Sequence, residues 1–244
     1  MASALGKRLH ARLSRLIFTV GSSLYAWMTW QPVWRAHCAS LADHFPPRPP
    51  PPRSPPSPLL STDGEGRLRV LDMGIGPGVS GIGLLDRRPD LRVFGADFAA
   101  PMLRYAKHYL QKAHADIPLC RADVTNLPFC DEAFDVVTHH SFLYLLADRE
   151  ASLREMARVL KPGGRYVILE PQEGSRILQA LRIAGPKRFK LSMLLWRIFS
   201  GGYGRFQKAE LRALLERHGF VDVQVDETLD GMGLLARASK ARAA

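Results

Sequence analysis

The sequence has few cysteines, and their positions suggest neither a metal site nor a disulfide framework. Cys38, Cys120 and Cys130 are far apart and match no metal-ligand spacing. We therefore expect ordinary thiols in a reducing compartment, which is typical of a cytoplasmic protein, and no bound metal ion.

Long apolar runs are also absent. No stretch reaches the roughly 20 uninterrupted apolar residues that a membrane-spanning helix needs. Acidic residues are scarce: 23 Asp and Glu stand against 34 Lys and Arg, which gives a net charge of +11. This excess allows attraction to anionic membranes or to nucleic acid. No nucleic-acid-binding motif with interleaved aromatic residues accompanies the basic ones, so we expect no nucleic-acid partner.

What the sequence does contain is enough apolar material for a sizeable core. Hydrophobic residues make up 46% of 244 residues, which favours one α/β domain with accessory pieces. Changes in composition divide the chain into three parts. These are an N-terminal helical segment (1–45), a proline-rich linker (46–66) and the main domain (67–244).

The N-terminal segment begins with a basic amphipathic pattern over residues 1–24. Leu5, Leu9 and Leu13 recur at helical spacing, while Lys and Arg occupy other faces. Such a helix is suited to an anionic membrane surface. An aromatic stretch follows over residues 25–35. The length of the proline-rich linker leaves open whether these helices dock on their own core or reach elsewhere.

A glycine loop after a buried strand is the most informative motif. The strand covers residues 70–73, and Gly74, Gly76 and Gly78 follow at alternate positions before a helix pattern starts at Val79. Glycine lets the backbone turn tightly and approach a ligand, and the helix N-terminus offers free N–H groups and positive potential. Taken alone, the loop is equally compatible with a structural turn.

Three acids at successive strand ends favour a nucleotide site. Asp72 ends the first strand, Asp97 the second and Asp123 a third short apolar run. In nucleotide-binding α/β folds, an acid about 20 residues after the loop accepts hydrogen bonds from ribose hydroxyls. Parallel strands end at one edge of the sheet, so we expect the acids on one rim. The alternatives are a helix N-cap for Asp97 and a turn acid for Asp123.

The loop spacing G-x-G-x-G differs from the dinucleotide fingerprint G-x-G-x-x-G. Asp72 beside it disfavours a pyrophosphate, because two negative groups would approach each other, and suits a ligand with a cationic amino-acid portion. The motifs VLDMGIGPG, VFGADFAAPML, CRADVTNLPF, FDVVTHHSFLYLL and LREMARVLKPGGRYVILEP follow in order. With them, residues 69–238 resemble the class I S-adenosylmethionine (SAM) methyltransferases. Within that superfamily, the chain is most similar to the ubiquinone/menaquinone-biosynthesis (type 11) group.

The alternation of patterns predicts a doubly wound, Rossmann-like α/β fold. We expect a mostly parallel seven-stranded sheet with helices on both faces, preceded by the N-terminal helical segment. Strand patterns cover 69–73, 92–97, 118–122, 134–139, 164–169, 221–225 and 233–238, and helix patterns cover 79–87, 100–113, 148–160 and 208–218. We interpret residues 172–205, which look irregular, basic and aromatic, as a substrate cap.

The resemblance implies a role for each loop residue toward SAM. Gly74, Gly76 and Gly78 would approach its amino-acid portion and sugar. Asp72 would order the loop or the ammonium group, and Asp97 would hold the ribose hydroxyls.

The resemblance also implies an adenine side of the site. Phe98 and Met102 would pack beside the ring, and Asp123 would accept from its exocyclic amine beside the Val124 N–H. His139 would line the pocket near the methionine portion.

Methyl transfer displaces a sulfonium directly, so positioning supplies much of the rate and a dedicated base is optional. His139 and His140 are the candidate bases, since histidine titrates near neutral pH, and Tyr144 faces the same region. The alternative is that the histidines only shape the pocket. Quinone C-methyltransferases carry an arginine–asparagine pair near the place of Tyr144 and Leu145, and this chain lacks it.

We therefore expect a SAM-dependent methyltransferase that yields S-adenosylhomocysteine and acts on a hydrophobic small molecule, such as a quinone or lipid, in the cytoplasm or on the inner face of a membrane. Alternative activities are phospholipid N-methylation and O- or C-methylation of a soluble natural product. A SAM-binding regulatory protein that transfers no methyl group and a membrane-tethered scaffold belong to other classes.

Overall fold

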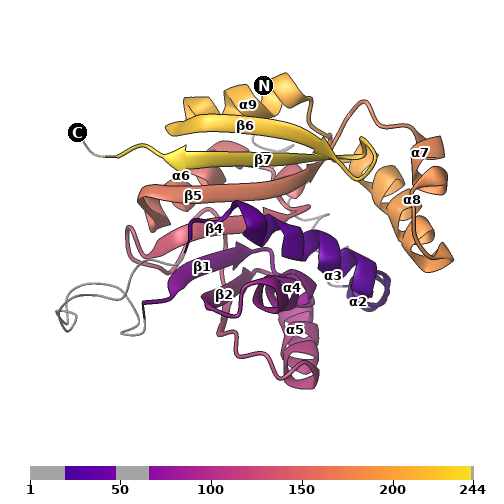
Figure 1. Ribbon diagram of the computed structural model, residues 1–244, viewed down its shortest axis with the longest axis horizontal. Helices are drawn as coiled ribbons and strands as arrows, with labels where there is room; N and C mark the ends of the chain where they lie inside the picture. The colour runs from indigo at the N-terminus through magenta and orange to yellow at the C-terminus, as the bar shows by residue number, and fades with distance from the viewer. Residues whose placement is uncertain (1–19, 48–65, 243–244) are drawn as a thin grey trace.

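The computed structural model describes residues 20–47 and 66–242, which include one seven-stranded sheet flanked by helices (Figure 1). Its strands lie in the order β3-β2-β1-β4-β5-β7-β6. Neighbours pair in parallel except β7, which runs antiparallel to β5 and β6. The strands are β1 (Leu68–Met73), β2 (Leu91–Asp97), β3 (Leu119–Arg121), β4 (Phe134–His140), β5 (Leu160–Pro171), β6 (Phe220–Thr228) and β7 (Gly233–Lys240).

Helices cover both faces of this sheet, so the predicted doubly wound, Rossmann-like fold is confirmed. The helices before β4 are α2 (Ser22–Thr29), α3 (Pro32–Ala39), the 3-10 helix η1 (Ser40–His44), α4 (Val79–Arg87) and α5 (Ala100–Lys112). Those after β4 are the 3-10 helix η2 (Leu143–Leu145), α6 (Arg149–Val159), α7 (Ile177–Arg182), α8 (Lys187–Gly201) and α9 (Lys208–Arg217).

Two expectations need correction. Strand β5 begins at Leu160, four residues before the predicted start. Residues 172–205 are not irregular, because they contain α7 and α8. In α8, Phe189, Met193 and Trp196 recur at helical spacing and are buried, so a packing face was present in a segment that its basic and aromatic composition made look irregular.

Along each strand, successive side chains point alternately into two hydrophobic cores, one on each face of the sheet. Val70 and Val136 pack with α3, α4 and α8, whereas Leu71 and Val137 pack with α6 and α9. The register pairs Val70 with Val136 and Leu71 with Val137, so each pair shares a face. The same alternation decides which of two adjacent histidines at the end of β4 reaches the site described below.

The helices α2 and α3 lie on their own main domain. Trp34 Nε1 donates to Ser192 Oγ of α8 over 2.8 Å, and Trp30 stacks on Tyr109 of α5 with ring centroids 3.9 Å apart. Most of the basic amphipathic pattern and of the proline-rich linker lies outside the described residues. Within the ranges 20–47 and 66–242, no helix is both long and apolar enough to cross a bilayer.

The carboxyl ends of β1, β2 and β4 meet at one edge of the sheet, where ligands bind in open α/β folds. Helices α7 and α8 follow β5 and stand beyond this edge, while α2 and α3 cross beside it (Figure 1). The fold therefore brings the N-terminal helices and α8 together over the glycine loop.

Candidate active site

The glycine loop turns sharply and is bonded to the neighbouring strand. Gly74, Gly76 and Gly78 have φ values of +66°, +53° and +87°, a left-handed region in which other residues are strained. The backbone N–H groups of Gly74 and Ile75 donate to Ala96 O over 2.8 and 3.1 Å. A Cβ on Gly74 would lie 2.3 Å from the Phe142 ring, so only glycine fits there.

Asp72 is buried beneath the loop and is bonded to the helix that follows. Its Oδ2 accepts a hydrogen bond of 2.6 Å from Ser80 Oγ in the first turn of α4. Burial raises the pKa of the Asp72 carboxyl to about 7, although the Ser80 hydrogen bond acts in the opposite direction. This contact supports the loop-ordering role expected for Asp72.

Asp97 joins the loop to the start of α5. Its Oδ2 accepts from the Gly76 N–H over 3.0 Å, and its Oδ1 accepts from the Ala99 N–H over 2.8 Å. Burial raises the pKa of Asp97 to about 6, against these backbone hydrogen bonds, which lower it. Each carboxylate oxygen has a second lone pair, so the contacts leave acceptor capacity for a ribose hydroxyl.

The residues expected around the adenine lie outside the cavity described below. Asp123 is exposed, and its Oδ1 accepts from the N–H and Oγ1 of Thr125 over 3.0 and 2.8 Å, which is the turn geometry of the alternative interpretation. Val124 and Met102 are buried, and Phe98 is half-buried. Their adenine contacts stay predictions.

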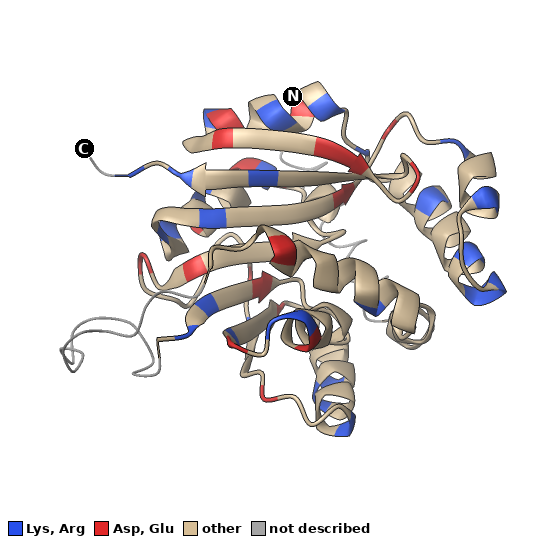
Figure 2. Cartoon of the chain, viewed as in Figure 1, with Lys and Arg blue, Asp and Glu red and all other residues tan. Residues whose placement is uncertain are grey.

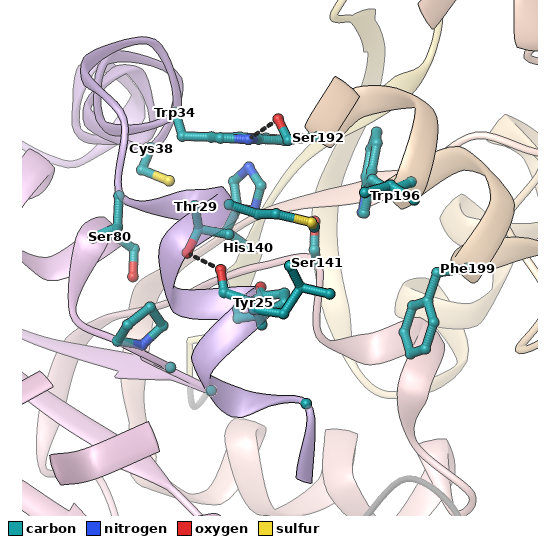
Figure 3. Close-up of a pocket in the computed structure, with 18 of the residues that line it drawn as sticks. Tyr25, Thr29, Trp34, Cys38, Ser80, His140, Ser141, Ser192, Trp196 and Phe199 are labelled. Atoms are coloured by element: carbon teal, nitrogen blue, oxygen red, sulfur yellow. Dashed lines mark hydrogen bonds between the residues drawn. The ribbon is translucent and has the colours of Figure 1, made fainter. Parts of the chain in front are cut away.

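A cavity of about 380 Å³ lies between the loop, the end of β4 and the covering helices (Figure 3). Its walls are mostly apolar and aromatic. The N-terminal helices contribute Tyr25, Met28, Trp34 and Cys38, the loop and the start of α4 contribute Gly74 to Pro77 and Ser80, the chain from the end of β4 to η2 contributes His140, Ser141 and Tyr144, and α8 contributes Ser192, Leu195, Trp196, Ile198 and Phe199.

Three buried polar atoms on this lining have no hydrogen-bond partner. They are His140 Nε2, Ser141 Oγ and Trp196 Nε1. Ser141 and Trp196 are only 7% and 8% exposed. Buried polar groups without a hydrogen-bond partner cost free energy, so they favour a ligand that bonds to them. Ser141 also has φ +55°, which is uncommon for serine and turns the chain sharply after β4.

The two candidate bases, His139 and His140, lie on opposite faces of β4. His140 lines the cavity, and burial lowers its pKa to about 4, so the ring is neutral near pH 7. His139 points to the opposite face of β4, with 0% of its side chain exposed and Nε2 2.6 Å from Tyr166 Oη. His139 therefore does not line this cavity, because side chains alternate along a strand, and its contact with substrate or cofactor stays a prediction.

Tyr144 lines the cavity as expected, and a buried carboxylate holds its segment in place. Glu170, at the end of β5, accepts from the backbone N–H groups of Phe142, Leu143 and Tyr144 over 2.9, 2.8 and 3.0 Å. His139 Nδ1 lies 3.1 Å from Glu170 Oε1. The His139 ring thus packs beside the carboxylate that positions Tyr144, but its Nδ1 makes no hydrogen bond to it. Sequence reasoning missed Glu170, although an acid inside an apolar strand was a signal for it.

Residues 172–205 were interpreted as a substrate cap, but the individual lining residues of α8 were missed. Trp196 and Ser192 had no sequence signal that linked them to the loop, since only the tertiary packing against Trp34 brings them there. Tyr25 and Trp34 lie in the aromatic stretch noted in the sequence. Burial raises the pKa of the Tyr25 phenol, and the nearby Cys38 and Asp97 add to this effect.

These residues fit SAM on structural grounds. The glycine loop has the conformation that close approach of a ligand requires, and the Asp97 carboxylate is bonded to it through the Gly76 N–H. The unpaired Ser141 Oγ and His140 Nε2 line the cavity together with the loop. The amino-acid portion of SAM would lie along the loop and its ribose beside Asp97.

Replacing Asp97 by alanine is expected to weaken S-adenosylhomocysteine binding by about 1–3 kcal/mol, the scale of hydrogen bonds to a charged group. The variant loses both the proposed ribose acceptor and the carboxylate that holds Gly76. Isothermal titration calorimetry measures the affinity. Asp116→Ala, at the exposed ion pair with Arg92, is the matched control. An unchanged affinity in Asp97→Ala would remove Asp97 from the ribose role.

Comparisons with known proteins agree with this geometry. Residues 70–164 match a family model described as a methyltransferase domain. Over 102 residues, the chain is 43% identical to a demethylmenaquinone methyltransferase of Thermus thermophilus, covering 42% of this chain and 46% of that protein. A demethylmenaquinone methyltransferase of Corynebacterium urealyticum is 44% identical over 102 residues, covering 42% and 41%. The matched segment thus spans less than half of these relatives.

Solved structures share the fold at lower identity. A SAM-dependent methyltransferase from Aquifex aeolicus superposes with a TM-score of 0.56 and 20% identity, covering 71% of this chain and 82% of that one. The Haemonchus contortus phosphoethanolamine N-methyltransferase 2, solved with S-adenosylhomocysteine, gives a TM-score of 0.66 and 17% identity, covering 99% and 61%. Residues 70–164 thus match a methyltransferase domain, and the sheet and its helices share the fold of solved SAM-dependent methyltransferases.

Proposed function

We propose that this protein transfers the methyl group of SAM to an uncharged, apolar small molecule of the quinone type. The observation that supports this most is the cavity lining. It joins the glycine loop to apolar and aromatic walls, and none of the described lining residues is Lys, Arg, Asp or Glu. A charged acceptor would be buried there without an ionic partner, which is costly, so a neutral acceptor is favoured.

The relatives support the same substrate class, because they are named demethylmenaquinone methyltransferases. The missing arginine–asparagine pair near Tyr144 leaves the acceptor atom open between ring carbon and oxygen. The phosphoethanolamine acceptor of the Haemonchus enzyme is less compatible with this cavity, since a phosphate needs cationic or N–H donors in numbers that the lining lacks.

SAM, when bound, supplies a methyl group activated by the sulfonium. The protein's own residues align the acceptor and keep water out. Trp196 Nε1 and Ser141 Oγ are free to donate hydrogen bonds to an acceptor oxygen. The neutral His140 ring has an unpaired Nε2, which accepts a proton from the acceptor when the ring carries its hydrogen on Nδ1. Helices α2, α3 and α8 cover much of the cavity and so limit the access of water to it.

The cap role proposed for residues 172–205 fits this arrangement, because α8 forms one wall of the cavity. We propose in addition that the protein works in the cytoplasm at a membrane surface, where an apolar acceptor is concentrated. The basic pattern of residues 1–24 supports this location.

The test uses the full-length protein with methyl-labelled SAM and three acceptors: a demethylated naphthoquinone, phosphoethanolamine and a phosphatidylethanolamine vesicle. We expect labelled product from the quinone alone. Label in either amine would overturn the proposed acceptor class. Binding of S-adenosylhomocysteine without labelled product from any of them, or from a lipid extract, would favour the SAM-binding, non-methylating alternative.

A further inference from the structure

Three neighbouring helices expose apolar stripes instead of burying them. Val20, Leu24 and Trp27 recur at helical spacing at the start of the described chain and along α2, and Leu191 and Ile198 lie seven residues apart on α8. α7 packs on α8 and exposes Ile177, Leu178 and Leu181. These side chains are between 45% and 74% exposed. Exposed apolar groups gathered in this way mark an interaction surface.

The stripes of α2 and α8 meet at the cavity. Leu24 and Ile198 are both exposed and both line it. The two helices are also joined at the start of α8, where Arg188 donates to Trp27 O and its guanidinium lies 4.5 Å from the Trp27 ring centroid. The cavity therefore reaches the surface within the exposed apolar area.

The charge of this surface has one sign. Between residues 174 and 207 the sequence has seven basic residues and no acidic one. The basic residues are Arg176, Arg182, Lys187, Arg188, Lys190, Arg197 and Arg205. Figure 2 shows Lys and Arg on α7 and α8 without Asp or Glu, beside an α2 that has no charge. None of the ion pairs among the described residues involves these seven.

Acidic residues lie along one border of this surface. Gln179 of α7 donates to Asp230 O in the turn between β6 and β7, and Glu227 lies near the same turn, where its Oε1 accepts from Gln172 Nε2. The basic area is thus bounded on this side and extends from α7 along α8 toward α2.

We propose that the exposed stripes of α2, α7 and α8 form a docking surface for an anionic phospholipid bilayer, with the cavity mouth opening onto it. Apolar side chains surrounded by Lys and Arg, with a tryptophan among them, match the interfacial region of such a bilayer. In this orientation an apolar acceptor enters from the lipid without crossing water. That last step rests on the proposed function, whereas the docking surface does not.

Other occupants match this surface less well. A second copy of the chain would bring the same excess of basic residues against it, and like charges repel. The chain's own residues 1–19 are also basic, with Lys7, Arg8, Arg12 and Arg15. They join the described chain at Val20, on this same surface. Their charge therefore adds to attraction for anionic lipid and opposes packing against α7 and α8.

Vesicle flotation of the full-length protein tests the proposal. We expect the protein to float with vesicles of phosphatidylcholine and phosphatidylglycerol at low salt, and to bind less at high salt or without the anionic lipid. The double variant Arg182→Glu with Lys187→Glu is expected to weaken binding at least about tenfold, since each charge near the surface contributes. Leu178→Ser with Leu191→Ser is expected to weaken it about tenfold at both salt concentrations.

The matched control carries one charge reversal and one apolar-to-serine change away from this surface, Arg212→Glu on α9 and Val221→Ser on β6, and should float like the wild type. Vesicle binding unchanged in both test variants but lost in Arg12→Glu with Arg15→Glu would overturn the proposal in favour of residues 1–19. A dimer on size exclusion that the leucine variant dissociates would assign the surface to a second copy. S-adenosylhomocysteine affinity should be equal in all variants, so a failure of docking leaves the proposed methyl transfer standing.

Discussion

Replacing Glu170 by glutamine is expected to lower the free energy of unfolding by about 2–4 kcal/mol, the range for losing hydrogen bonds to a buried charge. Glu170 is completely buried, and its two carboxylate oxygens accept all three backbone N–H groups of residues 142 to 144. A glutamine side chain has one acceptor oxygen, and its amide N–H₂ would face a donor. At least one buried N–H is then left without an acceptor.

The same change should reduce methyl transfer. The segment that Glu170 holds carries Tyr144 into the cavity and rests the Phe142 ring on Gly74. Because reacting groups must be aligned closely, a shift of this segment lowers kcat even in molecules that stay folded.

Urea unfolding measures the loss of stability, and hydrogen exchange at the amides of residues 142 to 144 measures the local loosening. Glu173→Gln is the matched control, since this glutamate is exposed and only three residues away. Surface substitutions of this kind change stability by less than about 0.5 kcal/mol. Equal exchange rates in Glu170→Gln and the wild type would show that the carboxylate does not organise the segment.

Replacing His140 by asparagine is expected to lower kcat by about 100-fold, the lower end of the range for general bases. His140 is the histidine whose unpaired nitrogen lies on the cavity lining. Burial lowers its pKa to about 4, which keeps it neutral but also makes it a weaker base than one matched to pH 7. We therefore expect a decrease in kcat at the low end of the range for general bases.

The lowered pKa of His140 also predicts the pH dependence. A histidine with its usual pKa would lose base activity as the pH falls through about 6.5. The His140 ring becomes protonated only near its pKa of about 4, so its contribution to kcat should persist from pH 8 to about pH 5. The measurement is kcat at saturating SAM for the wild type and for His140→Asn across this range.

Two controls separate catalysis from pocket shape. His139→Asn changes the buried histidine on the opposite face of β4, so it should reduce stability more than the chemical step in folded enzyme. If His140→Asn raises KM while kcat stays within about threefold of the wild type, the ring only shapes the pocket. That result would support the alternative interpretation, in which the histidines only shape the pocket.

Much of the fold could be read from the sequence because its signals are local. The apolar strand before Gly74, the alternate glycines and the helix pattern after them depend on residues close together in the chain. The acids Asp72 and Asp97 followed from the same spacing, and the structure brings both to the loop. Repeated strand and helix patterns then permit few topologies, since parallel crossovers have one hand.

The alternation of side chains on β4 is also a local property of the sequence. The prediction that both histidines are candidate bases did not take it into account. His139 and His140 are adjacent in an extended strand, so they point to opposite faces of the sheet. Only one of them could reach a given cavity. Which one does so depends on the helices that cover each face, and that is a property of the tertiary fold.

By itself, the sequence determined the class of fold and the glycine loop, because close residues with fixed spacing specify each of them, and its resemblance to a known family predicted the methyl donor. Only the tertiary structure decided what surrounds the acceptor. Trp34 and Ser192 are 158 residues apart and meet through a hydrogen bond. Glu170, at the end of β5, binds the backbone of residues 142 to 144, which follow the neighbouring strand β4. Such contacts depend on how whole helices and strands pack, and no local pattern in the chain encodes that packing on its own.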